Sequence, residues 1–414
     1  MLLKKLVSSN KYAASVYSLL AIDSLLTFVS IPLILTYVAT AVYGDWLIIF
    51  ALVAILAFMD CGIAGILTGK IRSNYNSDDV SQFIYVVILI LVGYISVSVI
   101  AYSGFVYLLD ALFKLVDFRD LLLLALISLF LQLASNLSES ILVGAGREYE
   151  AKLAVIAGAI VQFGLLAICL HQGVGIYSLP ISLICRHMLV LILQFRMLKV
   201  VEFKSFDKAF VGSMFREIVP IARINLFGKL ASSTSTNIVP LAIGYFWGST
   251  FLVNFNITAK LLLLAQTIID RLNSIMLPRI IDLRKNQGSL NQYVSHYFRR
   301  LALGLTLCIC FLPVFNHAFV SIWVGDEFFL GISFSFILAL HLYSASFSNS
   351  LSYLFIAVQY FGWPAKMVMI ENFIKLFCVI VMSYSVIGFL LSTSVVSVFF
   401  SRRYLRKWRK ILET

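Results

Sequence analysis

Long apolar runs, separated by short clusters of charged and turn-forming residues, extend along the whole chain. A helix that crosses a bilayer needs about 20 consecutive apolar residues. The pattern therefore predicts an all-α membrane protein with twelve spans joined by short loops. We expect a turn near Gly388 between the last two spans, which are short. The predicted spans are residues 13–39, 46–68, 82–109, 121–143, 152–170, 176–197, 217–241, 250–277, 300–323, 328–357, 367–384 and 386–401.

The composition agrees with a membrane location. Of the 414 residues, 61% are hydrophobic and 13% are charged, whereas a soluble domain has about 45–50% apolar and about 25% charged residues. So few charged side chains cannot cover a water-soluble body of this size. This excludes a soluble enzyme, a disordered protein and a nucleic-acid-binding domain, and the net charge of +12 indicates basic loops on an anionic membrane face.

Lysine and arginine are distributed unequally between the two sides of the predicted membrane. The side that holds the N-terminus collects 24 of them, and the opposite side holds two, Lys114 and Arg119. Basic loops stay in the cytoplasm during membrane insertion. The distribution therefore predicts an even number of spans with both termini cytoplasmic.

The loops and the scattered polar residues offer no catalytic module. No hydrophilic segment exceeds about twenty residues, and the sequence contains no G-x-x-x-x-G-K-[ST] phosphate-binding motif. The six cysteines and five histidines show no metal-ligand spacing. We therefore expect no enzyme activity, no cofactor and no metal, and transport is the leading interpretation.

Weak self-similarity suggests an internal duplication. Ile31-Pro32-Leu33 is echoed by Val239-Pro240-Leu241, and Asp60 is echoed by Asp270, in both cases about 210 residues later. Transporters are often built from such repeats. We expect two six-helix lobes, residues 1–205 and 206–414, that enclose a central cavity and alternate its access by rocking.

Charged residues inside the predicted spans are the candidate site. A charge at the bilayer centre costs about 2.5–3.5 kcal/mol, so each should face a watery cavity or an opposite charge. A cationic cavity would suit an anionic, phosphorylated cargo. The candidate substrate-binding residues are Arg186, Arg223, Lys229, Lys260 and Arg271. The acidic candidates for ion coupling are Asp23, Asp60, Glu139 and Asp270.

Some of these charges also have a structural interpretation. Glu371 and Lys375 are four residues apart on one helix and could neutralise each other. Arg223 could extend its side chain to the cytoplasmic interface, and Asp60 could make a buried helix-end contact. Arg186, Lys229 and Lys260 have no acidic residue three or four positions away, which favours a functional role for them.

Short motifs spread over most of the chain resemble those of polysaccharide-export flippases. The stretch AVYGDW at 41–46 is followed by MDCGI at 59–63, as in the first hairpin of that family. The turn GAGR at 144–147, the helix end SIMLPR at 274–279 and the outward turn WVGDEF at 323–328 are similar to family features. On these motifs the chain is identified as a member of the lipid-linked O-antigen repeat-unit translocases (Wzx-type), within the multidrug/oligosaccharidyl-lipid/polysaccharide exporter superfamily.

This resemblance implies twelve helices in two lobes that form a V. It implies an undecaprenyl-diphosphate-linked oligosaccharide as cargo, flipped to the periplasmic leaflet of a bacterial inner membrane for O-antigen or other surface polysaccharide synthesis. The expected partners are the lipid bilayer, the polysaccharide polymerase and the chain-length regulator, with no nucleic acid, and we expect a monomer.

Two other functions remain open at this stage. A cation-coupled multidrug antiporter of the same superfamily would use Asp23, Asp60 and Glu139 as its ion site. A membrane glycan polymerase or acyltransferase is a further alternative, although the short outward loops argue against it.

Overall fold

The computed structural model describes residues 2–73, 80–113, 118–198, 207–283, 287–357, 362–382 and 384–413. All regular secondary structure in these ranges is helical, which confirms the predicted all-α class. Each of the twelve predicted spans coincides with one helix or with consecutive helices. Within the described ranges, eight helical segments are long and apolar enough to cross a membrane, and Ala21–Tyr37 and Asn237–Trp247 are shorter apolar helices. The count of twelve spans stays a prediction.

The chain divides into two compact units, Met1–Ser233 (unit 1) and Thr234–Thr414 (unit 2). The division falls inside one continuous helix, α8 (Lys208–Trp247), so the first part of α8 belongs to unit 1 and the rest to unit 2. The predicted lobe boundary at 205/206 lies outside the described residues and stays a prediction.

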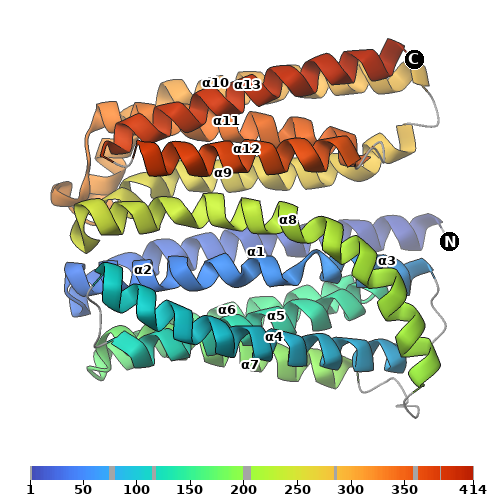
Figure 1. Ribbon diagram of the computed structural model, residues 1–414, viewed down its shortest axis with the longest axis horizontal. Coiled ribbons are helices and arrows are strands. Elements are labelled where there is room, and N and C mark those ends of the chain that lie inside the picture. Colours follow the sequence, from blue (N-terminus) through green and yellow to red (C-terminus); the bar gives the residue numbers. More distant parts are fainter. Residues whose placement is uncertain are drawn as a thin grey trace. The chain divides into compact units, whose positions relative to one another are not determined.

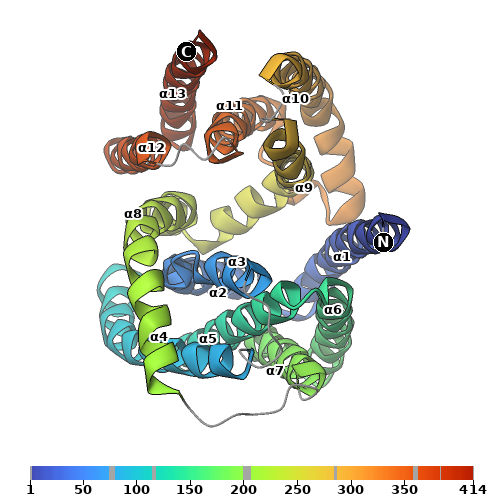
Figure 2. The ribbon, with the colours of Figure 1, turned by 90° about the vertical axis from the view of Figure 1, so that its right-hand side faces the viewer.

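Unit 1 is organised around α5, which packs against α2, α3, α4 and α7, while α6 packs against α1 and α7 (Figure 2). More than half of the residues of α5 are buried, and small serine residues are among them. The elements before α8 are α1 (Leu2–Tyr37), α2 (Thr40–Ile55), η1 (Leu56–Asp60), α3 (Ile63–Ser73), α4 (Val80–Leu108), η2 (Leu109–Phe113), α5 (Arg119–Gly144), α6 (Glu148–His171), η4 (Gly175–Tyr177) and α7 (Ser178–Leu198).

Unit 2 has α11 at its centre, in contact with α9, α10 and α13, while α12 packs on α13 (Figure 1). The helix α10 exposes large apolar side chains, including Leu303, Phe311 and Phe315. In a membrane protein such a surface faces acyl chains rather than water. The elements that follow α8 are α9 (Ser249–Leu283), α10 (Gln287–Trp323), η5 (Asp326–Phe328), α11 (Ile332–Ala357), α12 (Gly362–Val381) and α13 (Val386–Glu413).

The second predicted span, 46–68, is not one continuous helix. It consists of α2, the 3-10 helix η1 and α3, with a break at Cys61 and Gly62, whose φ angles are 47° and 71°. Glycine adopts this left-handed conformation without the clash that a Cβ causes. The hydrophobic pattern runs through this break and therefore concealed it.

The predicted turn at Gly388 was placed too late. The helix α12 ends at Val381 and α13 begins at Val386, and the backbone N–H of Gly388 donates to the Ser385 hydroxyl, 3.1 Å away. A serine that accepts from the first turn of a helix marks its start, so Gly388 lies inside α13. The helix also continues past the predicted end at residue 401, to Glu413.

Candidate functional site

The break between η1 and α3 is the most unusual backbone feature of unit 1, and we call residues 60–62 the break site. Asp60 is the last residue of η1, and Cys61 after it is a non-glycine residue with a φ of 47°. A side chain in the left-handed region costs roughly 1–2 kcal/mol, and such strain concentrates at functional sites. Interrupted helices within apolar segments are also where transporters bind their substrates.

The first half of α8 packs directly on the break site. A Cβ atom added to Gly62 would lie 3.1 Å from Nδ2 of Asn225, so only glycine fits at this distance without displacing Asn225. Farther along α8, the hydroxyl of Ser233 lies 3.0 Å from the carbonyl oxygen of Ala54 and 2.9 Å from that of Ile55. These carbonyls stand where α2 changes into η1. Ser233 therefore supplies a donor at the point where the helical hydrogen bonding changes.

Lys229 lies between these two contacts and carries the charge of the site. Its Nζ atom is 3.9 Å from Oδ2 of Asp60, the outer limit of an ion pair. The Lys229 side chain is 53% exposed and that of Asp60 is 22% exposed. A pair this long and open contributes little to stability, so the ammonium group remains available to an anionic ligand.

Tyr94 on α4 adds a polar group to the same region. Its ring is buried, and its hydroxyl has no hydrogen-bond partner among the described residues. The hydroxyl lies within electrostatic reach of Asp60 and Cys61. An unpaired buried hydroxyl costs about 1–3 kcal/mol, so this region of unit 1 holds an unfavourable polar group in its interior.

Arg186 forms a second polar cluster in unit 1. Its guanidinium donates to Oε1 of Gln162, 2.8 Å away, and to Oδ1 of Asp23, 3.4 Å away, so it joins α7 to α6 and α1. The Arg186 side chain is 19% exposed. Next to it, the ring of His187 lies 3.5 Å from the Ser135 hydroxyl. Arg186 on α7 is thus held by side chains of α6 and α1. Its acidic partner, Asp23, lies far from it in the sequence.

The other predicted site residues are spread over both units. Glu139 on α5 pairs with Lys152 on α6, and Arg223 is exposed on α8. Lys260 is half-buried on α9 in unit 2, with no carboxylate at ion-pair distance among the described residues. The side chains of Asp270 and Arg271 lie outside the part of the chain that the structure describes.

The structural interpretation of Glu371 and Lys375 is confirmed. Nζ of Lys375 lies 2.6 Å from Oε1 of Glu371, and the side chains are 13% and 6% exposed. The Ser348 hydroxyl lies 3.1 and 3.0 Å from the two carboxylate oxygens. This neutral, buried arrangement joins α12 to α11 inside unit 2.

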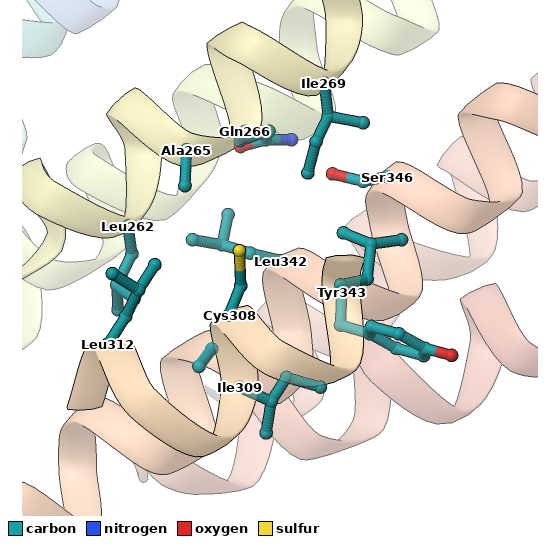
Figure 3. Close-up of a pocket in the computed structure, with 12 residues that line it drawn as sticks. Leu262, Ala265, Gln266, Ile269, Cys308, Ile309, Leu312, Leu342, Tyr343 and Ser346 are labelled. Atoms are coloured by element: carbon teal, nitrogen blue, oxygen red, sulfur yellow. The ribbon is translucent and has the colours of Figure 1, made fainter. Parts of the chain in front are cut away.

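A pocket in unit 2 lies between α9, α10 and α11, with an empty volume of about 290 Å³ that includes space open to the surroundings (Figure 3). Its lining is mostly aliphatic, with Gln266 and Ser346 as polar members and Cys308 on the α10 side. None of the described residues that line it is charged. Its chemistry therefore suits an apolar occupant and does not suit a phosphate.

Sequence reasoning did not identify Tyr94 or Asn225 as members of the site, whereas Ser233 shares a polar helix face with Lys229, four residues earlier. The one available signal for the break was the Asp60-Cys61-Gly62 triplet, because a glycine after a polar residue inside an apolar run indicates a helix break. Single tyrosine and asparagine residues carry no such signal, since they are common in packed membrane helices.

The chain is similar to a known protein family in sequence. Residues 38–330 match a family profile described as "Polysaccharide biosynthesis protein". No curated protein sequence matches the chain.

Solved structures resemble the whole chain in fold. The lipid II flippase MurJ, in an inward closed conformation, has a TM-score of 0.69 and 13% identity, over 96% of this chain and 87% of MurJ. An inward-facing MATE multidrug transporter of the MOP superfamily has a TM-score of 0.71 and 14% identity, over 96% and 94% of the two chains.

A MOP transporter from Pyrococcus furiosus, described as having a binding pocket of reverse polarity, has a TM-score of 0.64 and 12% identity, over 98% and 94% of the two chains. At these identities the likenesses establish the fold alone, which is the one that these membrane proteins share.

Proposed function

Because this multi-pass membrane chain belongs to the polysaccharide biosynthesis protein family, we propose that it flips an undecaprenyl-diphosphate-linked oligosaccharide across a bacterial inner membrane. The cargo would be a repeat unit of O-antigen or of another surface polysaccharide, moved from the cytoplasmic to the periplasmic leaflet. MurJ, which shares the fold, is named as a flippase of a lipid-linked molecule. Both termini would lie in the cytoplasm, as the distribution of basic residues predicts.

The half-exposed Lys229 ammonium at the break site is the observation that carries this proposal. A diphosphate would bind it through charge-assisted hydrogen bonds. Arg223, exposed on the same helix, would add positive charge. Asn225, which lies against Gly62 at the break site, would contact phosphate or sugar oxygens, while the polyprenyl chain stays in the lipid.

Transport would require the two units to move relative to each other, so that the bound headgroup meets each side of the membrane in turn. Lys260 gives unit 2 a cation without a described acidic partner. We propose that each of these lysines, Lys229 in unit 1 and Lys260 in unit 2, contacts the diphosphate at its own stage of passage. Arg186, which is hydrogen-bonded to Gln162 and Asp23, would hold the shape of unit 1 next to the headgroup.

The multidrug antiporter is less well supported. A cation-coupled antiporter needs a carboxylate that is free to bind a proton or a metal cation. Asp23 and Glu139 pair with Arg186 and Lys152, and Asp60 has the ammonium of Lys229 beside it, whose positive charge disfavours a bound cation there. We therefore propose no antiport function.

The proposal is tested by neutralising the two lysines in a strain that lacks the chromosomal gene. Lys229→Gln, Lys260→Gln and the double variant should lower the surface glycan strongly and cause lipid-linked precursor to accumulate in the membrane. Lys229→Arg keeps the charge and should retain most of the glycan. Lys208→Gln, at the exposed start of the same helix α8, is the matched control and should have no effect.

Membrane protein levels, measured on immunoblots, separate lost transport from lost protein. Wild-type glycan in both single variants and in the double variant would refute the cationic mechanism. A glycan defect without precursor accumulation would place the defect outside translocation.

A further inference from the structure

One end of unit 2 carries a group of exposed basic side chains from three helices. Figure 1 shows the C-terminal end of α13 beside the beginning of α10, and buried residues of both helices share one cluster there. We call the group the basic surface. It consists of Arg299 and Arg300 of α10, Lys366 of α12, and Arg402, Arg406 and Arg409 of α13.

An aromatic cluster holds this surface in shape. Phe355 of α11 lies 5.9 Å from Tyr404 and 5.8 Å from Trp408 of α13, between ring centroids. Trp363 lies 5.7 Å from Tyr404. Tyr404 and Trp408 are buried, and residues four apart lie on one face of a helix. The inward face of the last turns of α13 is therefore fixed against the rest of unit 2.

The fixed inward face determines where the arginines lie. Arg402, Arg406 and Arg409 follow each other at spacings of four and three residues, on the face opposite Tyr404 and Trp408. They therefore form one outward stripe on a rigid helix. Membrane topology alone accounts for basic residues in cytoplasmic loops. It does not require that they form a stripe on a helix whose opposite face is fixed by aromatic packing.

The charge of the basic surface is not balanced within the protein. The sequence of α10 contains no Asp or Glu, and the one acidic residue of α13 is Glu413 in its last turn. Among the described residues, no carboxylate lies at ion-pair distance from the six basic side chains. Arg403, next to the stripe, instead has its guanidinium carbon 4.9 Å from the centre of the Phe399 ring. Among the described residues, the charge of this surface is therefore left open to anions from outside the chain.

The depth of the stripe agrees with a lipid headgroup as the source of these anions. Sixteen residues of helix separate Val386 from Arg402, which corresponds to about 24 Å at 1.5 Å per residue. The hydrocarbon core is about 30 Å thick, and the long arginine side chain covers the remaining few ångströms, so the Arg402 guanidinium reaches the headgroup level. Trp363 and Trp408 lie at the same end, as aromatic residues commonly do at the membrane interface.

We propose that the basic surface is a docking site for the headgroups of anionic phospholipids in the leaflet that it meets. Guanidinium groups bind phosphate bidentately, and basic groups near a membrane attract anionic lipid. The proposal concerns unit 2 and bulk phospholipid. It does not depend on the flippase function, whose central residue, Lys229, lies in unit 1.

Native mass spectrometry of the purified full-length chain in detergent tests the proposal, with phosphatidylglycerol, phosphatidylcholine and undecaprenyl phosphate as probes. The wild type should bind phosphatidylglycerol at least about tenfold more tightly than phosphatidylcholine. The triple variant R402Q/R406Q/R409Q should reduce this preference to less than about twofold. R402K/R406K/R409K keeps the charge and should retain most of the preference.

The matched control neutralises three exposed cations of unit 1, in R196Q/K208Q/R216Q, and should retain the wild-type preference. Equal loss in this control would show a general charge effect and overturn the assignment to unit 2. Equal binding of the two phospholipids by the wild type would overturn the proposal without any variant. Preference for undecaprenyl phosphate alone would overturn the choice of phospholipid as occupant.

Discussion

Lys229 and Asp60 meet at 3.9 Å between the ammonium nitrogen and a carboxylate oxygen, at the point where a helix of unit 1 breaks. The lysine is more than half exposed. Exposed ion pairs contribute about 0.2–1 kcal/mol. Asp60 therefore orients Lys229 without removing its charge from the reach of a ligand.

Replacing Asp60 by Asn should consequently change stability by less than about 1 kcal/mol and reduce surface glycan less than Lys229→Gln does. Thermal unfolding of D60N, K229Q and the double variant in detergent gives the coupling energy between the two residues. A coupling above about 3 kcal/mol, the range of buried pairs, would show that Lys229 is a structural residue.

Gly62 should be intolerant of any side chain. Gly62→Ala places a Cβ at a φ of 71° and 3.1 Å from Nδ2 of Asn225, so we expect a loss of about 1–2 kcal/mol in unfolding free energy. Transport should also fall, because Asn225 must move away from the break site.

Gly65→Ala is the control for this variant. Gly65 lies three residues later in α3, with no heavy atom within 4 Å of an added Cβ. Alanine favours the helix at such a position, so stability should be unchanged or slightly higher. Equal effects of the two substitutions would contradict a special role of the break.

The helices were predictable because apolar length is a local property of the sequence. The contacts of the charged residues were not, because their partners are distant. Asp23 meets Arg186 across 163 positions, and no local spacing could reveal that pair. Glu371 and Lys375 were predictable as a pair because one helix turn separates them.

The break site shows a second limit of the sequence. Asp60 was recognised as a buried charge, but the change from α2 to η1 leaves the hydrophobic pattern intact. The turn before α13 was misplaced for a related reason. Glycine is the residue type there that most favours a turn. However, the Ser385 hydroxyl caps α13, so Gly388 lies in the first turn of that helix.

Gly158 on α6 should control the position of Arg186. An added Cβ would lie 2.5 Å from Cγ2 of Val190 and 3.2 Å from the carbonyl oxygen of Arg186. Gly158→Ala should therefore push α7 away from α6, cost about 1–3 kcal/mol and lower transport. Thermal unfolding and surface glycan are the two measurements.

Gly164→Ala on the same helix has open space around the added methyl group and should be tolerated. The double variant G158A/V190A removes the closest clashing atom and should recover part of the stability lost in G158A. Without such recovery, the clash with Val190 would not be the cause of the loss.

The buried pair of Glu371 and Lys375 supports the last prediction. Glu371→Gln leaves the Lys375 ammonium buried without its counter-charge, and Lys375→Met leaves the carboxylate with Ser348 as its one remaining partner among the contacts described. Each single change should cost about 3–5 kcal/mol. The double variant E371Q/K375M buries no charge, so its loss should be well below the sum of the two single losses. Thermal unfolding in detergent measures all three, with Lys366→Met, exposed on the same helix, as the near-neutral control. Additive losses would mean that the two side chains, although 2.6 Å apart, do not stabilise each other.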